Sequence, residues 1–338
     1  MSEAVIVDAI RTPVGRAIKG TLRDIRADDL AAIPLRALVE RNPDIDFRET
    51  DDVMMGCGFP DHEQGYNIAR NATLLAGLDH HIPGVTVNRF CASSLQTIRM
   101  AFHAIRAGEG DQYIAAGVEC TSRGAGMTLP AMNPRLEGSN GTGYNVYIPM
   151  GLTAENVAER CKVSREAQDE WAAISQQRAV AARESGHFDP EIVGVDIPEM
   201  HDAGGDVIPA HSVTRDDGPR PGTTMEALAK LKPAFKPGGS VTAGNSCPLN
   251  DGAAAVLVMS EEKARERGVK PRARIVASAV AAVRPEIMGL APIPAIRAVL
   301  KQAGLKVDDI DLFELNEAFA AQVVPCRDEL GIDPEKLN

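Results

Sequence analysis

The stretch from Val85 to Ala116, VTVNRFCASSLQTIRMAFHAIRAGEGDQYIAA, decides the predicted fold. A short β-branched run predicts a strand over 85–88, and a helix follows over 91–107 because apolar residues recur at spacings of three and four. Those residues are Leu95, Ile98, Phe102 and Ile105. Gly108 ends the helix, and a buried strand is predicted over 112–116. This order is typical of a sheet with helices on its faces.

The same alternation extends upstream and recurs downstream. Strands are predicted over 4–8 and 52–55, with helices over 28–41 and 66–76. A buried strand is predicted over 252–260. The first pattern then restarts, with strands predicted over 274–279 and 309–314 and helices over 294–303 and 316–330. The repeated order predicts an internal duplication of one α/β domain.

The middle of the chain has a different character. The stretches 121–147 and 198–224 are rich in residues that favour loops, and Ser164 is a suitable N-cap for a long helix that ends near 185. We therefore predict a loop insertion over 120–248, because long loops within compact domains often cover functional sites. The first core half would comprise 1–119 and 249–268, and the second core half 269–338.

Composition excludes several classes of function. The 338 residues include 36 Lys and Arg against 47 Asp and Glu, for a net charge of −11. Binding to nucleic acid or to an anionic membrane surface requires a basic face, so we expect neither partner. No signal peptide or transmembrane run is recognisable, and we expect a cytoplasmic protein. No metal site is predicted, because no Cys or His cluster has ligand spacing, and the dinucleotide fingerprint G-x-G-x-x-G does not follow the first strand.

Cys91 is the cysteine with the most informative position. It lies where the strand over 85–88 passes into the helix over 91–107. A thiol at a helix amino end lies near unpaired N–H groups and the positive end of the helix dipole, and both favour the thiolate. Position alone leaves two interpretations open: a reactive nucleophile, or a small residue at a tight turn.

Four motifs resemble the signatures of the thiolase family. They are NRFCASSLQ at 88–96, MGLTAENVA at 150–158, VTAGNSCPLNDGAAA at 241–255 and NEAFA at 316–320. Two further runs, MMGCG at 54–58 and RMAFHAI at 99–105, are most similar to degradative 3-ketoacyl-CoA thiolases of the actinobacterial type. The resemblance implies a duplicated α-β-α-β-α layered fold with an inserted loop domain. It also implies a homodimer or homotetramer.

The resemblance implies an acyl-CoA C-acyltransferase with no tightly bound cofactor. It would cleave 3-ketoacyl-CoA with coenzyme A, or condense acetyl-CoA in reverse, through an acyl group on Cys91. The Cys91 N–H would donate to an oxyanion, and Asn316 would hold the water of the enolate oxyanion hole. Position alone favours a second interpretation for Asn316, as the N-cap of the helix over 316–330, and the two roles are compatible.

The resemblance also implies a set of residues that contact coenzyme A. Arg220 corresponds to an arginine that contacts coenzyme A, and Cys247 occupies a position where many biosynthetic members have a serine. Positions that line the pantetheine tunnel are Met150, Phe235, Ala243, Met288 and Phe319. Nearby positive charge would come from Lys230, Lys232 and Lys236. Core packing and solvated surface lysines are the alternative interpretations.

Two further catalytic motifs of the family, Gly-His-Pro and Cys-x-Gly-Gly-Gly, do not occur in the sequence. Cys326 follows Asn316 without the glycines, so we predict a core position for it. We expect that the chain is truncated before those motifs, with an incomplete second half. The alternative function is a non-catalytic thiolase-like subunit that binds acyl-CoA or pairs with a complete partner.

Overall fold

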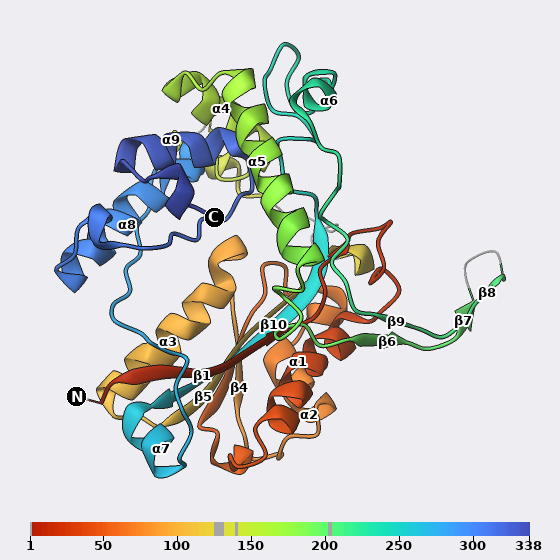
Figure 1. The fold of residues 1–338 in the computed structure, drawn as a ribbon, viewed down its shortest axis with the longest axis vertical. Coiled ribbons are helices and arrows are strands. Elements are labelled where there is room, and N and C mark those ends of the chain that lie inside the picture. The colour runs from red at the N-terminus through yellow and green to blue at the C-terminus, as the bar shows by residue number, and fades with distance from the viewer. Residues whose placement is uncertain (1, 125–131, 139–140, 202–204) are drawn as a thin grey trace. The chain divides into compact units, whose positions relative to one another are not determined.

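A computed structural model describes residues 2–124, 132–138, 141–201 and 205–338 (Figure 1). The chain divides into two compact units. The first consists of Met1–Thr128, Gly186–Gly218 and Leu249–Ile275, and the second of Leu129–Ser185, Pro219–Pro248 and Val276–Asn338. Parts of the predicted loops 121–147 and 198–224, namely 125–131, 139–140 and 202–204, lie outside the described residues.

The first unit is built on a mixed seven-stranded sheet with the order β11-β1-β10-β5-β3-β4, in which β2 also pairs with β10. β3 runs parallel to both β4 and β5, whereas the other pairings are antiparallel. The strands are β1 (Ala4–Arg11), β2 (Gly15–Arg16), β3 (Asp52–Gly56), β4 (Gly84–Val87), β5 (Gln112–Cys120), β10 (Asn250–Ser260) and β11 (Ala273–Arg274). The sheet predicted for an α/β fold is therefore confirmed, and it is mixed rather than wholly parallel.

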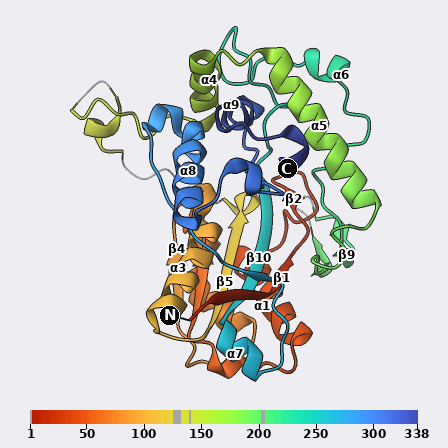
Figure 2. The same ribbon diagram turned by 60° about the vertical axis from the view of Figure 1, so that its left-hand side comes forward.

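Helices cover both faces of this sheet (Figures 1 and 2). On one face, α1 (Ala27–Arg41) and α2 (Ile68–Leu75) pack against Val53 and Ile114. On the other face, α3 (Ser93–Ala107) packs against Met54 and Tyr113. Successive strand residues thus point to opposite helical layers, as the pleat requires. The short helix α7 (Glu261–Glu266) directly follows β10.

The helix predicted over 91–107 is confirmed with one correction. A 3-10 turn, η3 (Phe90–Ala92), precedes α3, so Cys91 lies in this turn rather than in the α-helix. Phe102 and Ile105 are buried as expected, but Leu95 is 70% exposed. Leu95 follows the helical spacing, yet it lies on the exposed side of the first turn of α3.

Part of the stretch predicted as the second irregular loop forms short strands of the first unit. β6 (Val195–Ile197) pairs with β9 (His211–Val213), and β7 (Met200–His201) pairs with β8 (Val207–Ile208). Val195, Ile197 and Val213 join the core beneath α1 and α2. The segment Gly186–Gly218 is therefore part of the first unit and supplies residues to its core.

The second unit is mainly helical in the part that the structure describes. Its helices are α4 (Met150–Cys161), α5 (Arg165–Glu184), α6 (Met225–Ala229), α8 (Pro292–Ala303) and α9 (Ala320–Leu330). Ser164 caps α5 as predicted, since its side chain accepts from the Ala167 N–H at 3.1 Å. Trp171 of α5 packs with Val323 and Cys326 of α9, and Cys326 is fully buried as expected.

Two predicted strands of the second half are wrong. Of 274–279, only Arg274 belongs to a strand, the two-residue β11. Of 309–314, only Phe313 forms a β-bridge, to Leu337. A strand is stable only when a neighbouring strand pairs with its backbone. Val276 and Val280 are instead exposed in the described part of the chain.

Within residues 2–124, 132–138, 141–201 and 205–338, no helix is long and apolar enough to span a membrane.

Two glycines allow α3 to approach the sheet closely. A Cβ atom at Gly56 would crowd the backbone of Ser93 and Ser94, and a Cβ atom at Gly117 would overlap the Ser94 hydroxyl. Gly56 and Gly117 are paired neighbours on β3 and β5. The amino end of α3 therefore rests directly on two adjacent strands.

Replacing Gly117 with alanine should destabilise the protein by about 1–3 kcal/mol, because the new methyl group has no room beneath Ser94. Urea unfolding measures this change. Gly218→Ala is the matched control, since a Cβ atom at Gly218 meets nothing within 4 Å. The control should stay within about 0.5 kcal/mol. Equal stabilities of the two variants would contradict the proposed close contact.

Candidate functional site

Cys91 lies at the predicted strand-to-helix turn of the first unit. β4 ends at Val87, η3 spans Phe90–Ala92 and α3 begins at Ser93. The Cys91 side chain is exposed. The turn thus presents a thiol to solvent at the amino end of a long helix, whose first N–H groups have no partners within the helix.

The backbone of this turn is strained at the residue before the thiol. Phe90 has a φ of 47°, a region that bulky side chains rarely adopt and that costs about 1–3 kcal/mol. Asn88 Oδ1 accepts from the Phe90 N–H at 2.9 Å, while Asn88 Nδ2 donates to Gly58 O at 3.0 Å. Ser93 Oγ accepts from the Arg89 N–H and donates to Phe90 O, at 2.8 and 2.6 Å. Side chains on both sides therefore hold the strained turn.

A polar network fixes the loop that supports Asn88. The Gly58 N–H donates to Glu119 Oε2 at 2.7 Å, and Gln64 Nε2 donates to Glu119 Oε1 at 2.8 Å. Gln64 is buried and also accepts from the Cys120 N–H at 2.6 Å. Sequence reasoning did not find Gln64 and Glu119, because 55 residues separate them along the chain and no local pattern links them.

Burial separates the six cysteines by reactivity. Burial raises the pKa of Cys57, Cys120 and Cys326 to about 12, so these thiols stay protonated near neutral pH. Burial also raises the pKa of Cys161, which is half-buried. Cys91 and Cys247 are the two exposed cysteines.

The second unit brings several of the predicted coenzyme A residues together. The rings of Phe235 and Phe319 meet edge to face with centroids 6.0 Å apart. A Cβ atom at Gly151 would overlap the Phe235 ring, so this ring lies directly on the first turn of α4, beside Met150. Met150 and Phe235 are 45% and 42% exposed. Met150 and the two rings therefore form an accessible apolar surface on the first turn of α4.

The loop of residues 240–247 is attached to this surface and to α9. The Ala320 N–H donates to Asn245 O and the Cys247 N–H donates to Ala318 O, both at 3.0 Å. Ser246 forms a β-bridge with Phe319. The exposed positions Ala243 and Cys247 consequently belong to the same region as the two phenylalanine rings.

Buried carboxylates hold the loop of residues 240–247 from behind. Glu155 of α4 accepts from the Ser240 N–H at 3.0 Å and from the Val241 N–H at 2.9 Å. Asp169 of α5 accepts from Asn245 Nδ2 at 2.9 Å. Both carboxylates are almost fully buried. Neither carboxylate was predicted from the sequence. Glu155 lies within the motif at 150–158, which could have drawn attention to it, whereas Asp169 lies in none of the four motifs.

Asn316 is not the N-cap that its position favoured. α9 begins at Ala320 with Phe319 as its N-cap, because Phe319 pairs with Ser246 and stays extended. Asn316 is exposed, and its carbonyl accepts from Gln322 Nε2 at 3.1 Å. The neighbouring Glu317 accepts from Trp171 Nε1 at 2.7 Å, which fixes the backbone beside Asn316.

The remaining predicted residues lie on other elements of the second unit. Met288 is 41% exposed in the 3-10 helix η6 (Pro285–Leu290), which packs on α4. Arg220 lines a cavity of about 200 Å³ along α5, and its N–H donates to Gln176 Oε1 at 2.7 Å. Lys236 pairs with Glu159 at 3.2 Å. Arg220 therefore lies on a different part of the unit from the two rings.

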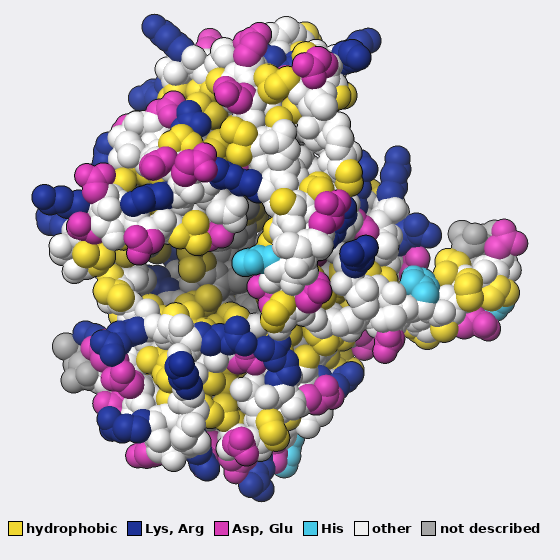
Figure 3. All heavy atoms as spheres, viewed as in Figure 1, with side chains coloured by type: hydrophobic (Ala, Val, Ile, Leu, Met, Phe, Trp, Pro, Cys, Tyr) yellow, Lys and Arg dark blue, Asp and Glu magenta, His cyan; other side chains and the backbone are white. Residues whose placement is uncertain are grey.

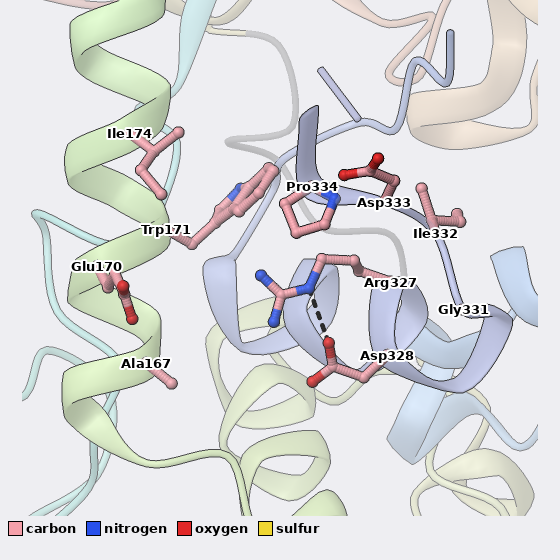
Figure 4. A pocket seen from close by; sticks show the side chains of 10 residues that line it. All are labelled: Ala167, Glu170, Trp171, Ile174, Arg327, Asp328, Gly331, Ile332, Asp333 and Pro334. Atoms are coloured by element: carbon pink, nitrogen blue, oxygen red, sulfur yellow. Dashed lines mark hydrogen bonds and ion pairs between the residues drawn. The ribbon is translucent and has the colours of Figure 1, made fainter. Parts of the chain in front are cut away.

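A second cavity, of about 640 Å³, lies between α5 and the carboxyl end of α9 (Figure 4). Trp171 and Arg327 face it, and Arg327 pairs with Asp328 at 2.7 Å. No predicted site residue lines it.

On the visible surface, cationic and anionic side chains are interspersed (Figure 3). No metal-binding cluster of His, Cys, Asp and Glu is found among the described residues.

Alkylation by iodoacetamide of the folded protein near pH 8 should label Cys91 and Cys247. It should spare Cys57, Cys120 and Cys326, because a thiol with a pKa near 12 has almost no thiolate at that pH. The three protected thiols should become reactive in denaturing urea. Peptide mass spectrometry measures each site, and labelling of the three in the folded state at the rate of Cys91 would contradict the assigned burial.

Glu155→Gln should destabilise the protein by about 1–3 kcal/mol, because the new amide group would face backbone N–H groups that need an acceptor. Glu159→Gln is the matched control on the same helix, since Glu159 is exposed and pairs with Lys236. The control should change stability by about 0.5 kcal/mol or less. Urea unfolding compares the two variants, and an equal effect would contradict the role of Glu155.

Comparison with known proteins supports the family inferred from the motifs. Residues 4–262 match the model of the thiolase N-terminal domain, and residues 269–338 match that of the thiolase C-terminal domain. The chain is 48% identical to a 3-ketoacyl-CoA thiolase of Cronobacter sakazakii and 46% identical to a beta-ketoadipyl-CoA thiolase of Acinetobacter baylyi. Each match covers 100% of this chain and 86% of the relative.

A solved structure of similar sequence has the same fold. The crystal structure of the Bacillus anthracis acetyl-CoA acetyltransferase superposes with a TM-score of 0.88 at 39% sequence identity. The match covers 100% of this chain and 86% of that chain. Family models that match both halves, close relatives and a shared fold agree, and the chain belongs to the thiolase family.

Proposed function

We propose that this chain transfers acyl groups between carbon and the sulfur of coenzyme A, with Cys91 as the acyl acceptor. The observation that carries the proposal is the exposed thiol of Cys91 at the amino end of α3. Burial makes Cys57, Cys120 and Cys326 poor nucleophiles by comparison. The names of the relatives add the substrate class, 3-ketoacyl-CoA thioesters.

In the proposed degradative direction, Cys91 Sγ attacks the 3-keto carbonyl carbon. The bond between C2 and C3 breaks, and its electron pair leaves with the acetyl-CoA enolate, which then takes up a proton. The acyl group stays on Cys91 until the thiol of coenzyme A displaces it and restores the free cysteine. The Cys91 N–H would donate to the oxyanion at the attacked carbon, and Asn316 would hold a water molecule for the enolate oxygen.

Coenzyme A would bind to the second unit. The apolar surface formed by the exposed Met150 and Phe235 and the half-buried Phe319 suits the pantetheine arm, which needs apolar walls. Ala243, Cys247 and Met288 would extend this surface. Arg220, with Lys230, Lys232 and Lys236, would supply positive charge for the phosphate groups. Coenzyme A is a substrate here, and no tightly bound cofactor is proposed.

The second candidate is a non-catalytic thiolase-like subunit that binds acyl-CoA or pairs with a complete partner. Neither a Gly-His-Pro nor a Cys-x-Gly-Gly-Gly motif occurs among the 338 residues. In the thiolase resemblance these motifs carry the base that activates the nucleophile and the acid that moves the α-proton. Such a subunit would bind acyl-CoA on the second unit and would retain an acyl group on Cys91 without completing turnover.

The proposal extends to three further properties. The relatives' names favour degradation of 3-ketoacyl-CoA substrates, which include those derived from fatty acids. The family resemblance supports a homodimer or homotetramer. The acidic composition supports a cytoplasmic location, without nucleic acid or membrane partners.

Incubation with acetoacetyl-CoA should leave an acetyl group on the peptide that contains Cys91, as measured by mass spectrometry. Cys91→Ala should abolish this adduct, whereas Cys161→Ala is a control that should retain it. Adding coenzyme A then separates the two candidates. Release of the acetyl group with continued loss of the ketoacyl absorbance supports the thiolase, and a persistent adduct supports the acyl-binding subunit. Failure to form the adduct would overturn both.

A further inference from the structure

The two side chains that hold the turn before Cys91 act on opposite sides of Phe90. Asn88 binds the N–H of Phe90 and is itself attached to Gly58 on the neighbouring loop. Ser93 binds the carbonyl of Phe90 and the N–H of Arg89. Both peptide groups that flank Phe90 are therefore fixed by hydrogen bonds to side chains.

The ring of Phe90 contributes little to holding this conformation. Its side chain is 63% exposed, and its one recorded ring contact among the described residues is an edge-to-face contact with Phe59, at 5.8 Å between centroids. A φ of 47° is unfavourable for phenylalanine, so a turn without the two polar side chains would relax to negative φ. Such a relaxation rotates the peptide that leads directly into Cys91.

We propose that Asn88 and Ser93 are positioning residues that keep Phe90 in the left-handed region and thereby hold the Cys91 thiol at the amino end of α3. The inference rests on the proposed function only for the role of Cys91 as acyl acceptor. The hydrogen bonds that hold the turn do not depend on coenzyme A, because they all lie within the first unit. Asn88 and Ser93 act through the backbone, and neither is assigned a contact with substrate.

The first measurement is the rate at which iodoacetamide alkylates Cys91. Asn88→Ala should slow it by about tenfold, because relaxation of the strained turn moves the thiol from its exposed position at the amino end of α3. Ser93→Ala should slow it in the same direction and serves as the second variant if Asn88→Ala does not fold. Cys247, which is exposed in the other unit, is the internal control and should keep its rate.

A matched variant separates positioning from general loss of stability. Asn67 also bridges backbone and side chain beside β4, since its Nδ2 donates to Gly84 O at 2.7 Å and its Oδ1 accepts from Thr86 Oγ1 at 2.9 Å. It has no recorded contact with the turn. Asn67→Ala should therefore leave the alkylation rate of Cys91 unchanged. A loss equal to that of Asn88→Ala would overturn the proposal.

A rescue variant tests the strained residue directly. Glycine adopts positive φ at no steric cost, so Phe90→Gly in the Asn88→Ala background should restore most of the alkylation rate of Cys91. A merely structural role for Asn88 predicts no rescue, because glycine adds flexibility and removes the ring contact. An unchanged rate in Asn88→Ala, or no recovery in the double variant, would overturn the proposal.

Acylation by acetoacetyl-CoA provides the final readout. Asn88→Ala should lower the acylation rate at saturating substrate by about tenfold and leave the half-saturating concentration nearly unchanged, because the proposed coenzyme A residues lie in the other unit. A raised half-saturating concentration with an unchanged rate would contradict the proposal. If the unmodified chain forms no acyl adduct, the proposed function fails, while the alkylation series still decides the role of Asn88 and Ser93.

Discussion

The close approach of α3 to the sheet is the constraint on which the turn that carries Cys91 depends. Gly56 and Gly117 lie side by side on β3 and β5, and both lack the side chain that would push Ser93 and Ser94 away. Because the helix begins at this contact, the turn before it has little freedom. Within this turn the hydrogen bonds of Asn88 and Ser93 hold Phe90 in its left-handed conformation.

The two units use different physical means to hold exposed functional groups. In the first, hydrogen bonds from neutral side chains and close backbone packing fix the turn that carries Cys91. In the second, the buried carboxylates of Glu155 and Asp169 satisfy N–H groups of the loop of residues 240–247. A buried carboxylate is favourable only when hydrogen-bond donors surround it. The burial of Glu155 on α4 and of Asp169 on α5 therefore requires the loop to keep its N–H groups in place.

Local patterns in the sequence predicted the features that depend on neighbours along the chain. The strand, turn and helix around Cys91, the N-cap at Ser164 and the buried position of Cys326 were all found in this way. The network of Gln64 and Glu119 was not, because it joins distant segments. The strands over 274–279 and 309–314 failed for a related reason, since a β-branched run forms a strand only beside a partner.

The start of α9 illustrates how a distant contact overrides a local signal. Asn316 is a good capping residue, but Phe319 pairs with Ser246 and delays the helix to Ala320. The roles of Asn316 and of the residues assigned to coenzyme A rest on the family resemblance. The exposure of Met150 and Phe235, and the ring contact between Phe235 and Phe319, are features of the structure that do not depend on the resemblance.

The strand order has a consequence for synthesis on the ribosome. β10 lies between β1 and β5 and pairs with both, although it comes from Asn250–Ser260, late in the chain. The amino-terminal strands therefore cannot complete their hydrogen bonds until about three quarters of this sequence has been made. During that interval the apolar strand β5 has an open edge, and such an edge is a template for pairing with another strand.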